Sequence, residues 1–89
     1  MRIFKYLLKM EGKQKIDLPE NARILTVQTQ NGIPCIWAIV DEESTKTKHH
    51  TIRTYGTGHP FDSHIHCFYV GTYQLNGGNL VFHVFDENE

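Results

Sequence analysis

The amino-acid sequence predicts an all-β fold of about seven short, mainly antiparallel strands, arranged as a small barrel or a two-sheet sandwich. Apolar residues recur with a period of two rather than 3.6, and β-branched and aromatic residues are enriched where they do. The chain has 89 residues, which suits one domain, 1–89, and is too short for a doubly wound sheet or a (β/α)₈ barrel. The predicted strands are 2–8, 14–18, 23–30, 34–40, 49–55, 67–74 and 79–85.

Alternation predicts the first two strands. In the first strand, Ile3 and Phe4 point to opposite faces of the sheet, because successive side chains of a strand alternate in direction. A turn is expected around residues 11–13, where the chain reads Glu-Gly-Lys. Pro19 ends the second strand because proline cannot donate a hydrogen bond to a β ladder.

A β-hairpin between strands 23–30 and 34–40 has the strongest local signal. The two strands are joined at Asn31-Gly32, a pair that readily adopts the positive φ angles of tight hairpin turns. The segment 36–40 is apolar on both faces, which predicts a central strand covered on each side or enclosed in a barrel.

The second half of the chain continues the same pattern. In order, it has a charged loop at 41–48, strand 49–55, a stretch rich in glycine and histidine at 56–66, and a second hairpin of 67–74 and 79–85 around Asn76-Gly77-Gly78. The run of charges at 41–48 is expected to be a solvated connection. Residues 86–89 are expected to fray.

Charge and hydropathy exclude several classes of partner. Nine basic and ten acidic residues give a formal net charge of −1, so there is no broad cationic field for duplex DNA or an anionic membrane. No apolar stretch approaches the roughly 18–20 residues of a transmembrane helix, and a secretory signal is not expected. Cys35 and Cys67 are expected to be reduced, buried thiols.

A candidate ligand-binding site follows strand 49–55. Paired glycines let backbone N–H groups approach an anion, arginine grips phosphate in a bidentate manner, and tyrosine offers a stacking face. Together these residues resemble the ingredients of a nucleotide pocket. The alternative is an ordinary exit from a strand into a loop, with the tyrosine in the core. The candidate residues are Arg53, Tyr55, Gly56, Thr57, Gly58 and His59.

A metal site is a weaker hypothesis. Gly58, His64 and His66 have the spacing that opens the cupin metal motif, in which two histidines on one strand point toward a cation. The carboxylate that should follow falls on Val70 or Gly71, neither of which can be a ligand through its side chain. We therefore predict no metal and no cofactor, with His59, His64 and His66 as the residues of a metal-dependent enzyme if there were one.

Catalytic signatures are incomplete. His49-His50-Thr51 contains one His-x-Thr unit, half of the paired signature of two-histidine phosphodiesterases, and His83-Val84-Phe85 does not supply the second. No cysteine, serine or carboxylate pair has a recognisable nucleophile or acid–base context. We predict no catalytic residue, and a protein that is not an enzyme.

One further feature of the sequence is a set of six segments, 3–6, 14–19, 22–28, 37–38, 55–60 and 80–85. In these segments the chain resembles a family of small, largely uncharacterised proteins encoded by bacteriophages. The resemblance extends over nearly the whole chain, and its most specific part is the stretch Tyr-Gly-Thr-Gly-His-Pro. It implies a small accessory protein in the host cytoplasm of an infected bacterium, and it brings no catalytic residue with it.

Two functional hypotheses follow. In the first, the protein is a non-enzymatic counter-defence protein that sequesters a nucleotide-like or other phosphorylated small molecule through the segment 53–59. In the second, it inhibits a host defence or metabolic enzyme by binding it through a sheet edge or the loop 41–48. A homodimer is one arrangement that so small a domain allows.

Overall fold

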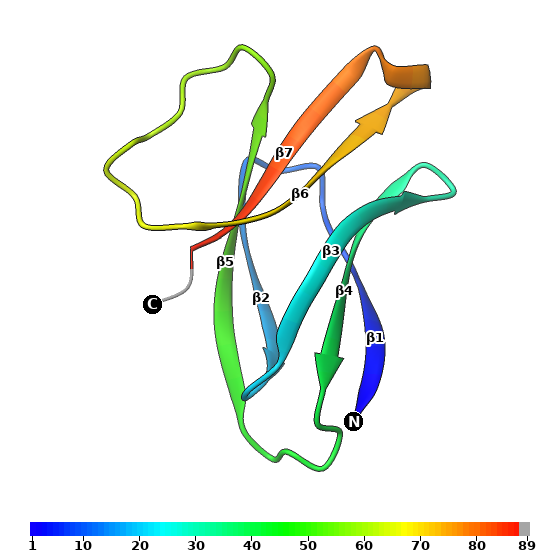
Figure 1. Ribbon diagram of the computed structural model, residues 1–89, viewed down its shortest axis with the longest axis vertical. Coiled ribbons are helices and arrows are strands. Elements are labelled where there is room, and N and C mark those ends of the chain that lie inside the picture. Colours follow the sequence, from blue (N-terminus) through cyan, green and yellow to red (C-terminus); the bar gives the residue numbers. More distant parts are fainter. Residues whose placement is uncertain (88–89) are drawn as a thin grey trace.

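The computed structural model describes residues 1–87 and contains two antiparallel β-sheets packed together (Figure 1). The sheets do not close into a barrel, so of the two predicted architectures the two-sheet sandwich is confirmed. The strands are β1 (Arg2–Leu7), β2 (Lys13–Pro19), β3 (Arg23–Gln30), β4 (Ile33–Val40), β5 (Thr47–Gly56), β6 (Phe68–Leu75) and β7 (Leu80–Glu87), with a short 3₁₀ turn at Asn76–Gly78.

One sheet has three strands in the order β1-β4-β3, and the other has four in the order β2-β5-β7-β6. Both predicted hairpins are present, β3 with β4 and β6 with β7. Asn31 and Gly32 have φ angles of 53° and 78°, as the Asn-Gly signal requires. The remaining pairs are β1 with β4, β2 with β5 and β5 with β7, and all three join segments far apart in the sequence.

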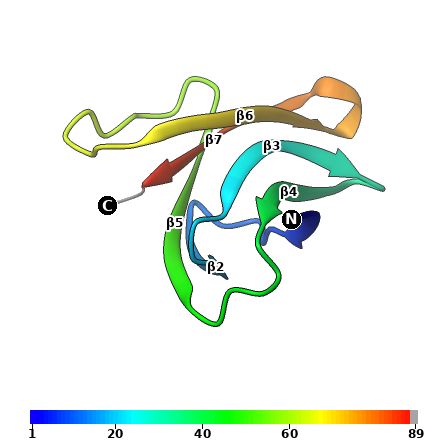
Figure 2. The same ribbon diagram turned by 60° about the horizontal axis from the view of Figure 1, so that its bottom comes forward.

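The core lies between the inner faces of the two sheets, because alternation along each strand turns its apolar residues inward. Gly71 of β6 lies so close to β3 that an added Cβ would be 2.9 Å from Cγ1 of Val27. Figure 2 shows β6 and β3 running side by side where the sheets meet. The buried core side chains are Leu8, Val27, Ile36, Ile52, Tyr73 and Val84.

The prediction that β4 is a central strand is confirmed, since β4 lies between β1 and β3. Its two faces are not equally covered. Ile36 and Ala38 are fully buried, whereas Trp37 and Ile39 on the other face are half-buried. The expectation of complete cover on both sides is therefore wrong for this strand.

Other corrections concern the chain end and the cysteines. Asp86 and Glu87 do not fray but pair within β7, because Asp86 is buried between the sheets; the same expectation for 88 and 89 lies outside the described residues. Both cysteines are free, and Cys35 is buried as predicted, but Cys67 is only half-buried. Within residues 1–87, no helix has the length and apolarity needed to cross a membrane.

Candidate functional site

The predicted site residues lie on both faces of the four-stranded sheet. Ile52 is in the core, so Arg53 and Tyr55 point to the opposite side, which we call the outer face. Gly56 is on the inner side, where it lines a hollow with His59. The six residues therefore do not line one pocket, and their role in ligand binding stays a prediction.

The Gly56–His59 segment is a tight turn. The N–H of His59 donates to the carbonyl of Gly56 (3.0 Å), and the N–H of Thr57 donates to the carbonyl of Val81 (3.1 Å). Two of the backbone donors expected to approach an anion are therefore used within the fold. Gly58 has a φ of 87°, which favours glycine. A Cβ on Gly56 would lie 2.8 Å from ring atoms of His59, so glycine allows the ring to pack there.

A chain of polar side chains ties this turn to β7 and β6. Thr57 Oγ1 is hydrogen-bonded to His83 Nε2 (2.7 Å), and His83 Nδ1 to Thr72 Oγ1 (3.0 Å). Thr72 Oγ1 is in turn hydrogen-bonded to the hydroxyl of Tyr69 (2.5 Å). Both ring nitrogens of His83 are engaged in hydrogen bonds to threonine hydroxyls, so this series of side chains braces the outer face.

Strand register places a row of side chains across the outer face. Lys13 of β2 lies opposite Arg53 of β5, Arg53 opposite Phe85 of β7, and Phe85 opposite Tyr69 of β6. Arg53 Nε donates to Glu87 Oε2 at 2.8 Å, and this bond raises the pKa of Arg53 further above its ordinary range. The row thus runs from cationic side chains at one edge to aromatic ones at the other.

Four aromatic rings gather around this row. Tyr55 and Phe85 are half-buried, and Phe61 comes from the loop between β5 and β6 to lie 4.6 Å from Tyr55 and 5.2 Å from Phe85, ring centre to ring centre. Tyr69 lies 5.5 Å from Phe85 in an edge-to-face arrangement. Tyr69 is 61% exposed and Phe61 47%. We call these four residues the aromatic cluster. The cluster offers exposed ring surface on the outer face of the sheet.

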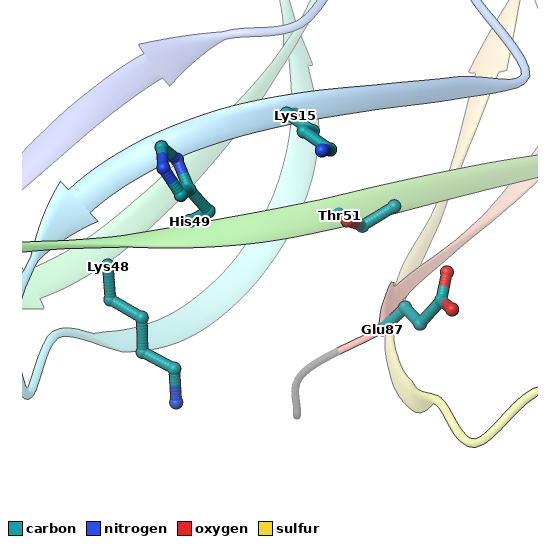
Figure 3. Close-up of a pocket in the computed structure, with 5 residues that line it drawn as sticks. All are labelled: Lys15, Lys48, His49, Thr51 and Glu87. Atoms are coloured by element: carbon teal, nitrogen blue, oxygen red, sulfur yellow. The ribbon is translucent and has the colours of Figure 1, made fainter.

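A hollow of about 410 Å³ lies further along β5, toward its N-terminal end. Figure 3 shows Lys15 reaching from β2 and Glu87 from β7, with Thr51 of β5 between them. Lys48 and His49 complete the lining, and His49 is hydrogen-bonded to Asp17. We call this the lysine hollow. Thr51 precedes Arg53 by two residues, so the hollow is roughly 6–7 Å along the strand from the cationic and aromatic row.

The metal hypothesis finds no support in the part of the chain that the structure describes. In residues 1–87, no three histidine, cysteine, aspartate or glutamate side chains come together in a way that could hold a metal ion. His59 lies in the turn after β5, and His64 and His66 follow in the loop before β6. In residues 1–87 the structure does not bring these three histidines together into a metal site, and the alternative of a metal-dependent enzyme stays a prediction.

Sequence reasoning missed Phe61, Tyr69, His83 and Phe85. The second hairpin, taken with a regular register, would pair Tyr69 with a different partner, because the register between β6 and β7 shifts between Tyr69 and Gly71. This irregularity has no signal in the sequence, and neither does the path of the loop that carries Phe61.

Comparison with known proteins gives one match. The model of a family described as a domain of unknown function, DUF7352, matches residues 1–89. No curated protein and no solved structure matches significantly. The chain, a single two-sheet sandwich over its described length, belongs to the DUF7352 family.

Proposed function

We propose that the protein is a non-enzymatic binding protein that holds a nucleotide-like, phosphorylated small molecule on the outer face of its four-stranded sheet. The observation that carries this proposal is the position of Arg53, which lies opposite Phe85 of the aromatic cluster and binds Glu87 in the lining of the lysine hollow. Stacking surface and cationic groups within one short distance are the two elements of nucleotide binding that do not require a specific motif.

The base would stack on the exposed rings. Tyr69 is the most exposed member of the aromatic cluster at 61%, and its hydroxyl is held by Thr72, so its ring is oriented before a ligand arrives. Stacking of a base on such a ring contributes about 1–3 kcal/mol and depends little on which base is present. This suits a protein that sequesters a nucleotide rather than one that reads a sequence.

The phosphate would lie in the lysine hollow. Lys15 supplies an ammonium group on this face, whereas Lys48 points the opposite way from its neighbour His49 (Figure 3). Arg53 stands between the hollow and the aromatic cluster and adds a second cationic group. Glu87 works against an anion, because its carboxylate lines the hollow and pairs with Arg53. A bound phosphate would compete with Glu87 for the guanidinium, which sets a moderate rather than a high affinity for the phosphate alone.

A melting experiment tests the proposal with ADP as the probe and with adenosine and inorganic phosphate as separate arms. At about ten times the dissociation constant, ADP should stabilise the protein by about 1.4 kcal/mol, or roughly 6–11 °C for a domain of this size. Adenosine and phosphate alone should each give a smaller shift. No shift with ADP at millimolar concentration would contradict the proposal.

Substitutions distinguish a binding site on the outer face from a binding site in the turn after β5. Tyr69→Ala and Lys15→Gln should each reduce the ADP shift, as should Arg53→Ala, with little change in the melting temperature of the free protein. His59→Ala should leave the shift unchanged, because His59 lines the hollow on the inner side. The opposite result, a shift lost only in His59→Ala, would return the site to the turn that the sequence suggested.

The biological setting we propose is an infected bacterium, with the protein acting in the host cytoplasm as a bacteriophage counter-defence factor. The support is the resemblance of the sequence segments given above. Native mass spectrometry of the protein isolated from phage-infected cells should find it with a bound small molecule. Isolation only as a complex with a host protein would favour the second hypothesis instead.

Binding to a host protein is the second candidate, and one observation favours it. β1 is an edge strand, and Ile3 and Leu7 on it are 59% and 61% exposed. Exposed apolar edge strands are common sites of strand addition. Pull-down from host lysate should recover a stoichiometric partner that Ile3→Lys releases and Lys46→Glu in the 41–48 loop does not. Recovery unaffected by Ile3→Lys would remove this edge as the site.

A further inference from the structure

The hollow that Gly56 and His59 line lies on the inner side of the four-stranded sheet, and the proposed nucleotide site makes no use of it. Its volume is about 260 Å³. This is more than the roughly 150 Å³ of an engineered cavity that binds benzene, and a little below the roughly 300–1,000 Å³ of sites for drug-sized ligands. The hollow has room for one ring with a short substituent. We call it the tyrosine pocket, and it is lined by Met10, Glu11, Gly12, Thr54, Gly56, His59, Tyr73 and Phe82.

Strand register forms the floor of the tyrosine pocket. Phe82 of β7 lies opposite Gly56 of β5 on one side and opposite Tyr73 of β6 on the other, and residues directly opposite each other share a face of the sheet. The ring centres of Tyr73 and Phe82 are 5.4 Å apart. Gly56 leaves a gap in this row, and the ring of His59 packs there, since an added Cβ would lie 2.8 Å from its atoms. The floor therefore presents aromatic surface bounded by an imidazole.

The connection between β1 and β2 supplies another wall. The carbonyl of Gly12 accepts a hydrogen bond from the N–H of Thr54 (2.9 Å), which fixes this end of the connection to β5. Met10 is 57% exposed, and methionine is flexible and adapts its shape to what it contacts. The wall is therefore anchored at Gly12 and adaptable at Met10.

The hydroxyl of Tyr73 is the polar group that selects a ligand. Tyr73 is 4% exposed, and its hydroxyl donates to Met10 Sδ at 3.9 Å. A thioether is a weak acceptor, and buried donors in folded proteins usually have a stronger one. Because Met10 itself lines the pocket, a ligand that contacts Met10 comes close to this hydroxyl. Burial raises the pKa of Tyr73, so the phenol keeps its proton and remains a donor at neutral pH.

The charge around the tyrosine pocket favours an uncharged ligand. The carboxylate of Glu11 belongs to the lining and disfavours an anion. A cationic ammonium or amidinium group has no acceptor to offer to the Tyr73 hydroxyl. A carbonyl oxygen accepts a hydrogen bond without carrying a charge, and its transfer from water costs less than that of a charged group.

We propose that the tyrosine pocket binds a compact, uncharged aromatic carbonyl compound, whose oxygen accepts a hydrogen bond from Tyr73 while its ring packs against Phe82. The carbonyl oxygen replaces Met10 Sδ as the acceptor. The proposal does not depend on the outer-face site, because it uses other residues on the opposite face of the sheet.

Titration of the ¹⁵N-labelled full chain tests this with acetophenone, α-methylstyrene and benzoate. The first two have nearly the same shape, but only acetophenone has a carbonyl oxygen, and benzoate carries a negative charge. Acetophenone should shift the amide signals of Gly12, Gly56, Tyr73 and Phe82. It should bind about three- to tenfold more tightly than α-methylstyrene, as expected for one hydrogen bond. Equal affinity for these two, tighter binding of benzoate, or no saturable shifts with acetophenone would overturn the proposal.

Tyr73→Phe locates the hydrogen bond, because it keeps the ring and removes the hydroxyl. The affinity for acetophenone should fall to that for α-methylstyrene, and the affinity for α-methylstyrene should not change. A purely structural role of Tyr73 would instead weaken the binding of both probes. Tyr69→Phe is the matched control, since it removes a hydroxyl from the outer face, and it should change neither affinity. Equal losses for both probes in Tyr73→Phe, or loss of the preference for acetophenone in Tyr69→Phe, would contradict the assignment.

Discussion

Two histidine–aspartate pairs sit on adjacent residues of β5 and face opposite ways. His49 is hydrogen-bonded to Asp17 on the outer face, with side chains 76% and 58% exposed. His50 is hydrogen-bonded to Asp86 between the sheets, with side chains 5% and 11% exposed. The chemical groups are the same in both pairs, and the period of two along a strand is what separates them.

This comparison shows how strongly burial changes the contribution of one kind of interaction to the free energy of unfolding. An exposed pair contributes about 0–1 kcal/mol, because water and salt screen it. A buried pair stabilises little in itself, but removal of one partner leaves the other without compensation and costs about 3–5 kcal/mol. Adjacent residues should therefore respond very differently to the same substitution.

The largest expected effect comes from His50→Leu. It should lower the free energy of unfolding by about 3–5 kcal/mol, since both oxygens of Asp86 would then lack partners. His49→Leu, the matched change on the outer face, should cost less than about 1 kcal/mol. Urea denaturation followed by circular dichroism measures both. Equal losses would show that the two faces are not distinguished by burial.

Gly71→Ala tests the inner face without touching either pair. The new Cβ would lie 2.9 Å from Val27 Cγ1, and we expect a loss of about 1–3 kcal/mol from overpacking where β6 meets β3. Gly12→Ala is the control, because its Cβ would meet only the carbonyl oxygen of Thr54 at 3.9 Å. A loss in Gly12→Ala as large as in Gly71→Ala would mean that glycine flexibility, not the close contact, is responsible.

A smaller effect is expected at high pH from Tyr73 of β6. Burial raises the pKa of Tyr73 above its ordinary value of 10.0. Above pH 10 the Tyr73 hydroxyl loses its proton in the unfolded chain before it does so in the folded protein. The free energy of unfolding is therefore unaffected by this group below pH 10, and it falls as the pH rises toward the pKa of Tyr73 in the folded protein. Tyr73→Phe should flatten this fall, and Tyr69→Phe on the outer face serves as its control. Identical pH dependence in Tyr73→Phe and the unmodified protein would contradict the assignment.

The smallest effect is expected from Asp17→Asn. Because both members of the outer pair are exposed, the free energy of unfolding should change by less than about 0.5 kcal/mol, and the difference should shrink further in salt. Thermal denaturation in low and high salt measures it. A loss above about 2 kcal/mol would place this pair in the class of buried interactions.

Local patterns predict the strands and hairpins of this protein well, and long-range partners poorly. Alternation and Asn31-Gly32 predict β3, β4 and the turn between them. Pairing of β1 with β4 has no local signal, because it depends on which apolar faces fit together. The same holds for His50 and Asp86, which are 36 residues apart in the sequence. Their contact follows from the register of β5 and β7, which only the folded sheet defines.

The candidate site shows a similar limit. Alternation along β5 was sufficient to separate Arg53 and Tyr55 from Gly56, although residue types alone had grouped them. The exposed ring of Phe61 reaches the outer face through an irregular loop, whose path depends on packing rather than on period. Residue types identified the side chains on β5 that could bind a ligand, and the geometry of the sheet determines which of these side chains lie on the same face.

The central claim, that a nucleotide-like ligand binds to the outer face, is tested most directly by mapping ADP on the ¹⁵N-labelled protein. The account predicts that saturable shifts cluster at Thr51, Arg53, Tyr69 and Phe85, with little change at core residues such as Val27 and Ile36. Shifts confined to the turn after β5, or no saturable shifts at all, would contradict it.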